Sequence, residues 1–310
     1  SSTGQDLAGP LTGFGTLTKS GDGVVTISGD NAGFTGLINA TAGSLRLGSS
    51  TALGGATVAV LSDGALDLGG QAISGKDIVV QGTGPGSTGA LINADTTTAA
   101  SWGGQVSLGS ASTGIGGDGD MTITGVVSGG GLTKYGEGTV TLANTNTYTG
   151  TLSIQQGTVR ALNQAALPIG DLGWSNSGSS AALDLVAPGD YPMATISSFG
   201  SNLRLVTSGP GTVSLTVAGQ NSLGGNADKT LQVGENVTAI LNGDIVAGSA
   251  NRERSLRFLN AGDVVINGTI SSSSTNLFGL VQTANSGEAV PENGTLHVNG
   301  FNVYNGVTRV

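Results

Sequence analysis

The chain has 310 residues, of which 56 are glycine, 37% are hydrophobic and only 10% are charged. Disordered chains are poor in hydrophobic residues and rich in charge, so this composition predicts a folded protein. The net charge of −9 argues against a nucleic-acid partner, which requires a basic surface, and the absence of cysteine excludes disulfides and thiolate metal sites.

Short pairs of apolar residues that alternate with polar residues recur along the whole chain. This period of two predicts strands with one buried face, and no segment sustains the apolar stripe of a helix, so we expect an all-β protein. The pairs are Leu45/Leu47, Val58/Val60, Leu66/Leu68, Ile78/Val80, Val106/Leu108, Met121/Ile123, Val140/Leu142, Leu152/Ile154, Leu183/Leu185, Leu203/Leu205, Leu215/Val217 and Val264/Ile266.

Three segments repeat one another, which is typical of architectures whose units stack on their neighbours. The first copy lies at about 13–47 and the second at about 129–160, where GGLTKYGEGTVTLANTNTYTG answers GTLTKSGDGVVTISGDNAGFTG. A third copy at about 264–310 is degenerate and truncated, with Gln282 in place of lysine. Paired positions of the first two copies are Leu17/Leu132, Lys19/Lys134, Gly21/Gly136, Gly43/Gly157 and Arg46/Arg160.

The motif Gly-Gly-Leu-Thr-Lys-x-Gly-x-Gly-Thr-x-Thr-Leu, followed by Asn-Thr-Tyr-Thr-Gly, resembles the passenger-associated repeat of bacterial autotransporters and related giant surface proteins. The resemblance implies a right-handed parallel β-helix (β-solenoid), secreted or on the outer surface of a Gram-negative-type bacterium. We expect one such solenoid over 1–310. Its turns would use glycine and asparagine at positive φ, and Leu17, Ile27, Leu132, Val140, Leu142, Leu152 and Ile154 would be buried.

Each repeat lysine precedes a Gly-x-Gly sequence that contains an acid, Asp22 in the first copy and Glu137 in the second. A phosphate loop would require a following helix or a Gly-Lys-Thr ending, and the sequence has neither. We therefore expect Lys19 and Lys134 to be surface residues that pair with a neighbouring acid.

Asp118 and Asp120 lie in GIGGDGDMTI, which resembles a calcium-binding nonapeptide repeat. Met121 stands where that repeat requires aspartate, and a single copy could not share ions between stacked turns. We expect no metal and no cofactor, with these two residues as the only metal candidates and a plain Gly-Asp turn as the prediction.

Residues 171–200 depart most from the repeat and hold Trp174, Pro188 and Pro192. We expect this segment to leave the solenoid as a loop on one face. Trp102, Trp174 and Tyr191 are the candidate contacts for a glycan, with packing or capping of loops as the alternative role.

The one concentration of charge is NRERSLRF, with Arg252, Glu253, Arg254 and Arg257. We expect these arginines to neutralise Asp244 and Asp263; a groove for acidic glycans is the alternative. His297, the one histidine, should face solvent, and no catalytic residue is predicted.

The final segment is expected to form an interface through Phe301, Val303, Tyr304, Val307 and Val310. Its partner would be an identical subunit placed end to end, or the continuation of a longer chain, because an exposed strand edge invites pairing. The sequence thus predicts a non-enzymatic extracellular structural segment, a stalk or filament subunit with an adhesive role. A carbohydrate-active or glycan-binding β-helix remains the alternative.

Overall fold

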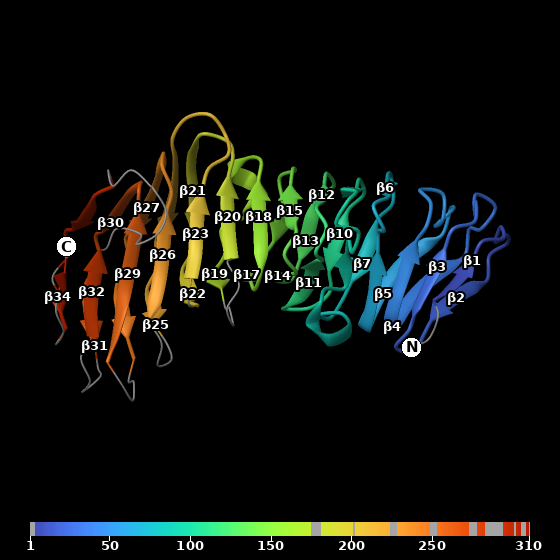
Figure 1. Ribbon diagram of the computed structural model, residues 1–310, viewed down its shortest axis with the longest axis horizontal. Coiled ribbons are helices and arrows are strands. Elements are labelled where there is room, and N and C mark those ends of the chain that lie inside the picture. Colours follow the sequence, from blue (N-terminus) through green and yellow to red (C-terminus); the bar gives the residue numbers. More distant parts are fainter. Residues whose placement is uncertain are drawn as a thin grey trace. The chain divides into compact units, whose positions relative to one another are not determined.

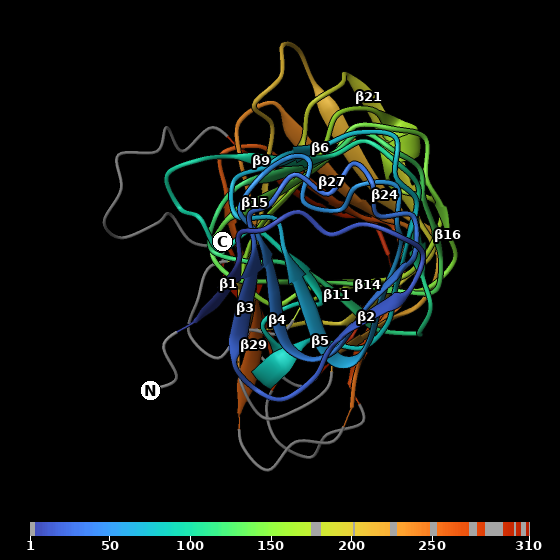
Figure 2. The same cartoon turned by 90° about the vertical axis from the view of Figure 1, so that its right-hand side faces the viewer.

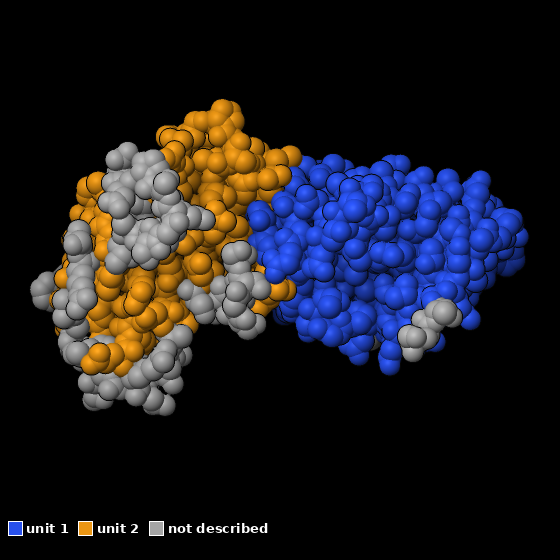
Figure 3. All heavy atoms as spheres, viewed as in Figure 1, with its two compact units in different colours: residues 1–151, 157–159 blue, residues 152–156, 160–310 orange. Residues whose placement is uncertain are grey.

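The structure, a computed structural model, describes residues 4–174, 181–200, 202–223, 228–248, 253–272, 278–282, 294–300, 302–304 and 308–309. The chain divides into two compact units (Figure 3). Unit 1 comprises residues 1–151 and 157–159, and unit 2 comprises residues 152–156 and 160–310.

Unit 1 is built from short strands and one 3-10 turn (Figure 1). They are β1 (Gln5–Leu7), β2 (Thr16–Lys19), β3 (Val24–Ile27), β4 (Leu37–Leu47), β5 (Thr57–Asp67), β6 (Ala72–Ile73), β7 (Ile78–Val80), η1 (Pro85–Ser87), β8 (Leu91–Ile92), β9 (Ala100–Trp102), β10 (Val106–Leu108), β11 (Thr113–Gly116), β12 (Met121–Ile123), β13 (Val127–Gly129), β14 (Leu132–Tyr135), β15 (Thr139–Leu142) and β16 (Thr147–Tyr148).

Unit 2 is also built from strands and one 3-10 turn. They are β17 (Leu152–Ile154), β18 (Gly157–Ala161), η2 (Gln164–Ala166), β19 (Leu172–Trp174), β20 (Ala181–Leu185), β21 (Gly189–Met193), β22 (Ile196–Ser198), β23 (Asn202–Val206), β24 (Val213–Val217), β25 (Asn221–Leu223), β26 (Lys229–Val233), β27 (Val237–Leu241), β28 (Ile245–Ala247), β29 (Arg254–Asn260), β30 (Asp263–Ile266), β31 (Ile270–Ser272), β32 (Phe278–Gln282), β33 (Leu296–Val298), β34 (Asn302–Val303) and β35 (Thr308–Arg309). The first three residues of β18, 157–159, belong to unit 1.

Strands pair in parallel with strands of the coil before and the coil after. Most partners are not neighbours in sequence; β3, β4 and β5 are the exception, because the long strand β4 pairs with both of the others. In unit 2, β23, β26 and β29 form one ladder, β24, β27 and β30 a second, and β25, β28 and β31 a third. Each coil therefore contributes one strand to each of three ladders, as unit 1 shows with β10 to β12 and β13 to β15. This arrangement confirms the predicted β-solenoid, and Figure 2 shows the strands of successive coils lying over one another.

The interior of each unit is filled by both apolar members of the alternating pairs, while the residue between them faces outward. Ile27, Leu132, Val140, Leu142, Leu152 and Ile154 are buried as expected. Leu17 is only half-buried, because β2 pairs on one side alone, with β4. Burial of each such side chain contributes about 1.5–3 kcal/mol, so aliphatic packing supplies a large part of the free energy that stabilises each unit.

The segment 171–200, expected to be a loop, instead carries β19 to β22, although residues 175–180 lie outside the described part. Each of these strands joins a parallel ladder; β21, for example, pairs with β24 over five residues. Pro192 fits within β21 because β21 is the end strand of its sheet and pairs on one side only, with β24, so the missing N–H is tolerated there. In the described residues, no helix is long and apolar enough to cross a membrane.

Candidate functional site

The two repeat lysines are buried, which corrects the expectation that they lie on the surface. Lys19 is 6% exposed, and its Nζ donates hydrogen bonds to the carbonyl oxygens of Ser20 at 3.2 Å, Gly21 at 2.6 Å and Ala42 at 2.8 Å. Ala42 lies on the next coil, so this ammonium group links two coils through main-chain carbonyls. The lysine is inward because Leu17 and Lys19 share one face of β2.

Lys134 repeats this arrangement in the second copy. It is fully buried, and its Nζ donates to the carbonyl oxygens of Tyr135 at 2.7 Å and Gly136 at 2.5 Å. Burial lowers the pKa of Lys134 from 10.5 to about 8, although the nearby Glu137, Asp118 and Asp120 act in the opposite direction. Burial also lowers the pKa of Lys19, which Asp22 partly opposes.

Glycines shape the carbonyl ring around each lysine. Gly21 and Gly136 have φ of 77° and 75°, and Gly43 and Gly157 have φ of 64° and 65°, so the two copies share backbone geometry. A Cβ on Gly43 would lie 2.5 Å from the Gly23 carbonyl oxygen and 2.6 Å from Lys19 Nζ. A side chain at Gly43 would therefore clash with its surroundings. The predicted equivalence of the two turns is confirmed at Gly21 and Gly136, whereas Gly23 and Gly138 do not have positive φ.

Buried asparagines form a second kind of inter-coil contact. Asn31, which is fully buried, accepts a hydrogen bond from the Leu11 N–H at 2.6 Å and donates to the Ala52 carbonyl at 2.6 Å. In the second copy, Asn146 Oδ1 accepts from the Val127 N–H at 2.8 Å. Each side chain lies between strands and satisfies main-chain groups of another coil, so asparagine here serves through its carboxamide and not through positive φ.

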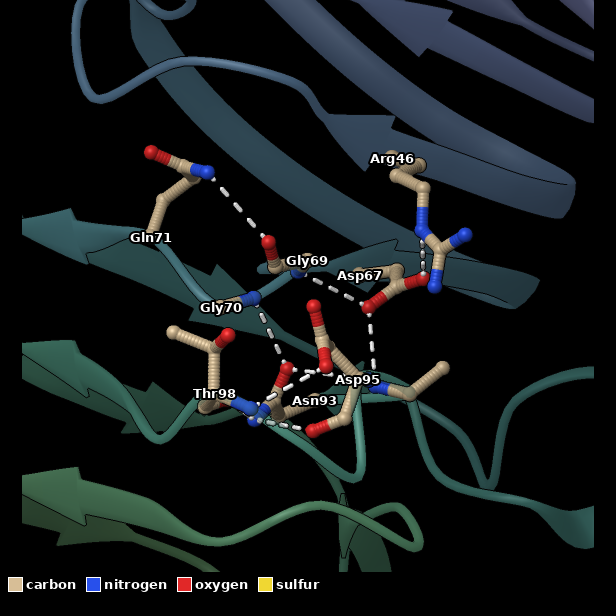
Figure 4. A network of polar contacts seen from close by, with 9 residues as sticks. Arg46, Asp67, Gly69, Gly70, Gln71, Asn93, Asp95 and Thr98 are labelled. Carbon is tan, nitrogen blue, oxygen red and sulfur yellow. Dashed lines mark hydrogen bonds and ion pairs between the residues drawn. The ribbon is translucent and has the colours of Figure 1, made fainter.

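The repeat arginine forms a third contact, shown in Figure 4. Arg46 Nε lies 2.8 Å from Asp67 Oδ2 of the next coil. Asp67 is almost fully buried, and its Oδ1 accepts from the Ala94 N–H of the coil after that and from the Gly69 N–H, both at 3.0 Å. One carboxylate thus joins three coils.

Asn93 extends this network below Asp67. Its Oδ1 accepts from the Gly70 N–H at 3.0 Å, and its Nδ2 donates to the carbonyl oxygens of Thr98 and Asp120, both at 2.9 Å. Figure 4 shows Asn93 between Gly70 and Thr98. The Asn93 carboxamide is fully buried and its oxygen and nitrogen are both hydrogen-bonded, so this side chain has no donor or acceptor to spare for a ligand.

The second repeat copy builds the same arginine contact within unit 2. Arg160 Nε lies 2.7 Å from Asp184 Oδ2, and Asp184 Oδ1 accepts from the Ser208 N–H at 2.8 Å. We call the lysine, asparagine and arginine arrangements together the inter-coil polar contacts. Each copy of the repeat supplies all three side chains, and the lysine bond to a carbonyl of the next coil is seen at Lys19.

The two metal candidates also bind main-chain groups of the next coil. Asp118 Oδ1 accepts from the Glu137 N–H at 3.1 Å, and Asp120 Oδ1 accepts from the Thr139 N–H at 2.8 Å. Among the described residues, no three histidine, aspartate or glutamate side chains are placed to hold a metal ion. The carboxylates have a structural partner in each case.

The structure does not support the three candidate glycan contacts. Trp102, Trp174 and Tyr191 are each 0% exposed, so no sugar ring can stack on them. The Trp174 ring packs on Phe199 with centroids 4.9 Å apart, and the Tyr191 hydroxyl bonds to the Ala187 main chain. Their side chains point inward from the strands, where burial of the large apolar ring area stabilises the fold.

We expected the arginines of this cluster to pair with Asp244 and Asp263, but Arg254 and Arg257 contact other groups. Arg254 is buried and donates to the carbonyl oxygens of Leu223 and Gly248, whereas Arg257 pairs with Asp228 at 3.1 Å. Arg254 shares the inward face of β29 with Leu256 and Phe258, which explains its burial. Arg252 lies outside the described residues.

Asp244 and Asp263 instead accept main-chain hydrogen bonds, from the N–H groups of Thr269 at 2.7 Å and Thr295 at 3.0 Å. His297 is exposed, as expected, and its Nε2 lies 3.0 Å from Thr295 Oγ1. These acids repeat the pattern of Asp118 and Asp120, in which a carboxylate accepts an N–H of the following coil.

Of the five interface candidates, Val303 and Tyr304 are described and Phe301, Val307 and Val310 are not. Val303 is exposed, whereas the Tyr304 ring packs edge-on against Phe278 with centroids 5.9 Å apart. The interface itself stays a prediction.

The family described as Passenger-associated-transport-repeat has a sequence model that matches residues 17–47 and 132–161. The chain carries two passenger-associated-transport repeats. The matched ranges contain the repeat lysine, asparagine and arginine of both copies. Several of their partners on adjacent coils lie outside these ranges.

A known protein is similar along nearly the whole chain. The chain is 29% identical to the Adhesin BmaC autotransporter of Brucella suis biovar 1 (strain 1330), over 96% of its own length. It spans only 7% of the length of that adhesin. No solved structure matches the chain.

Proposed function

We propose that the chain is a non-catalytic structural segment of a secreted or surface-exposed bacterial protein, a stalk or filament segment with an adhesive role. The observation that carries the proposal is the use made of the polar side chains in the passenger repeats. Lys19, Asn31 and Arg46, which could otherwise bind substrates, are engaged between coils by main-chain carbonyls and a buried carboxylate. Such contacts stabilise a stack and leave little chemistry at its surface.

The similarities to known sequences support a location outside the cell and an adhesive role. The passenger repeats and the similarity to an autotransporter adhesin both favour a protein outside the cell. The similarity covers a small part of that adhesin, so the adhesive role of this chain is our proposal.

Pairing at the outer strands is a second part of the proposal. Among the described strands, β33, β34 and β35 are edge strands of their sheets. We propose that they pair with strands of a further coil, from an identical subunit or from the same protein, by main-chain hydrogen bonding. Deletion of 301–310 should then weaken association more than substitutions at Val303.

The experiment is display of the chain on a bacterium that lacks adhesins, with a solenoid of equal length but unrelated surface as the control. We expect an extended surface structure and increased attachment to cultured cells. Attachment equal to that of the control would contradict the adhesive role. Release of reducing or unsaturated sugar ends from acidic polysaccharides by the purified chain would contradict the absence of catalysis and favour the carbohydrate-active alternative.

A further inference from the structure

Three asparagines on unit 2 stack in consecutive coils and hydrogen-bond to one another through their side chains. Asn242, Asn267 and Asn299 each follow directly after a strand, namely β27, β30 and β33. Asn267 Nδ2 donates to Asn242 Oδ1 at 2.8 Å, and Asn299 Nδ2 donates to Asn267 Oδ1 at 2.9 Å. We call these three residues the asparagine ladder. All three are exposed, unlike the buried asparagines of the repeats.

The main chain fixes each member of the ladder in register. The N–H groups of Asn242, Asn267 and Asn299 donate to the carbonyl oxygens of Val217, Leu241 and Ile266, each at 2.8 Å. The middle member uses both arms of its carboxamide within the ladder, whereas each outer member uses one. The three side chains therefore differ in how firmly they are held.

Each ladder asparagine is followed by a glycine: Gly243, Gly268 and Gly300. Within the described residues, no hydrogen bond from the N–H of these glycines is seen. A glycine has no Cβ to shield its nitrogen from the preceding side chain. The glycine nitrogens are therefore not engaged by a main-chain hydrogen bond in the described part of the chain; Gly243 and Gly300 are half-buried, and Gly268 is buried.

We propose that Asn242, Asn267 and Asn299 are sites of spontaneous deamidation, and that the ladder makes the reaction slower at Asn267 than at its two ends. In the reaction, the glycine nitrogen loses its proton to water or hydroxide and bonds to the asparagine Cγ, and ammonia leaves with a proton from solvent. The succinimide ring formed is then opened by one water molecule to aspartate or isoaspartate. Solvent supplies every co-reactant.

The ladder controls the order because ring closure requires the carboxamide to leave its hydrogen-bonded position. Asn299 and Asn242 must each break one side-chain hydrogen bond, and Asn267 must break two. One such bond corresponds to a factor of about five in rate, so Asn267 should react about fivefold more slowly than the ends.

The products would disturb the coils of unit 2. An aspartate at position 267 could no longer donate to Asn242 Oδ1, and two oxygens would face each other. An isoaspartate adds a carbon to the main chain at a corner where glycines are tightly stacked. A Cβ on Gly268 would overlap the Gly243 carbonyl oxygen, and one on Gly300 would overlap the Gly268 carbonyl oxygen. Deamidation is therefore expected to loosen these coils, which would limit the lifetime of a protein that is not replaced.

The test is incubation of the full chain at mildly alkaline pH, followed by peptide mass spectrometry to obtain a deamidation rate at each asparagine. We expect Asn299 and Asn242 to react about fivefold faster than Asn267 in the folded chain. In chain unfolded by urea the three rates should converge, because each site is then the same Asn-Gly dipeptide. Absence of deamidation at the three sites, or equal rates in the folded chain, would overturn the proposal.

Variants separate the ladder from local exposure. Asn299→Ala removes one of the two bonds of Asn267 and should raise the rate at Asn267 to that of an end position. Asn39→Ala, a substitution of the same type in unit 1, should leave all three rates unchanged. If Asn267 keeps its rate in Asn299→Ala, with circular dichroism showing an unchanged fold, the ladder does not control the reaction and the proposal is wrong.

Discussion

Replacement of Lys134 by methionine should change how the stability of unit 1 depends on pH. The side chain is fully buried, and its burial lowers the pKa from 10.5 to about 8. Between these two values the unfolded chain binds a proton that the folded chain does not, so the free energy of unfolding rises with pH. The contribution is absent below about pH 8 and is complete above about pH 10.5.

The size of the effect follows from the shift. Between pH 7 and about pH 9.5, a group with these two pKa values adds about 2 kcal/mol to the free energy of unfolding. Lys134→Met lacks the titrating group and should not show this gain, whereas other groups cancel in the comparison. Lys76→Met is the comparison variant. Lys76 is half-buried and donates to the Ala56 carbonyl at 2.8 Å, and burial lowers its pKa in the same direction but by less, so this variant should lose a smaller part of the gain.

The assay is urea unfolding at several pH values in a Trp174→Phe background, so that Trp102 fluorescence reports unit 1 alone. The wild type should gain about 2 kcal/mol relative to Lys134→Met over this range. A pH dependence that is the same in wild type and variant would show that Lys134 is not a buried cation, and a relative loss would refute the direction of the shift.

Three further predictions address the other contacts. Asn31→Ala leaves the Leu11 N–H and the Ala52 carbonyl without their partner and should lower the free energy of unfolding in urea by about 2–3 kcal/mol. The control Asn39→Ala should lower it by less than about 0.5 kcal/mol, and equal losses would show that the Asn31 contact does not stabilise unit 1. Gly43→Ala should destabilise unit 1 by more than about 2 kcal/mol, because φ is 64° and Lys19 Nζ occupies the space, whereas Gly15→Ala meets no atom within 4 Å; a tolerated Gly43→Ala would contradict the packing. The Thr295 hydroxyl and N–H donate hydrogen bonds to Asp263 and hold its pKa below the usual value. The stabilisation they provide is present above the unfolded pKa near 4 and is lost as pH falls through the lower folded value. Asp263→Asn should therefore reduce the acid sensitivity of unit 2, and an unchanged acid-unfolding midpoint would argue against this contact.

The fold could be predicted because its causes are local and repeated. Alternation such as Val140/Leu142 marks each strand, and the recurrence of a long motif indicates stacked coils. The same alternation could also have placed the lysines correctly, since Lys134 shares the inward face of β14 with Leu132. We expected a surface lysine because a charge beside a Gly-x-Gly turn is usually solvated, and the ring of main-chain carbonyls that replaces water is not visible in the sequence.

The partners of the remaining contacts could not be predicted, because they lie on other coils. Nothing in the sequence around Asn31 indicates Leu11 or Ala52, and Arg46 reaches Asp67 only once the register between coils is fixed. We expected asparagine to serve turns at positive φ, yet among the asparagines of the described residues only Asn236 has this conformation, at 61°. We expected Trp102, Trp174 and Tyr191 to contact a glycan at the surface. The alternation of inward and outward residues along their strands instead places these side chains in the interior.

The central claim is that the passenger repeats hold successive coils together through buried polar side chains. Amide hydrogen exchange, read by mass spectrometry, tests it on the triple variant Lys19→Met, Asn31→Ala and Arg46→Met. The account predicts that protection falls across β2 to β5 and is kept in β20 to β24, whereas a triple variant of outward residues, Thr18→Ala, Thr26→Ala and Asn39→Ala, exchanges like the wild type. Equal protection of β2 to β5 in the two triple variants would contradict the claim.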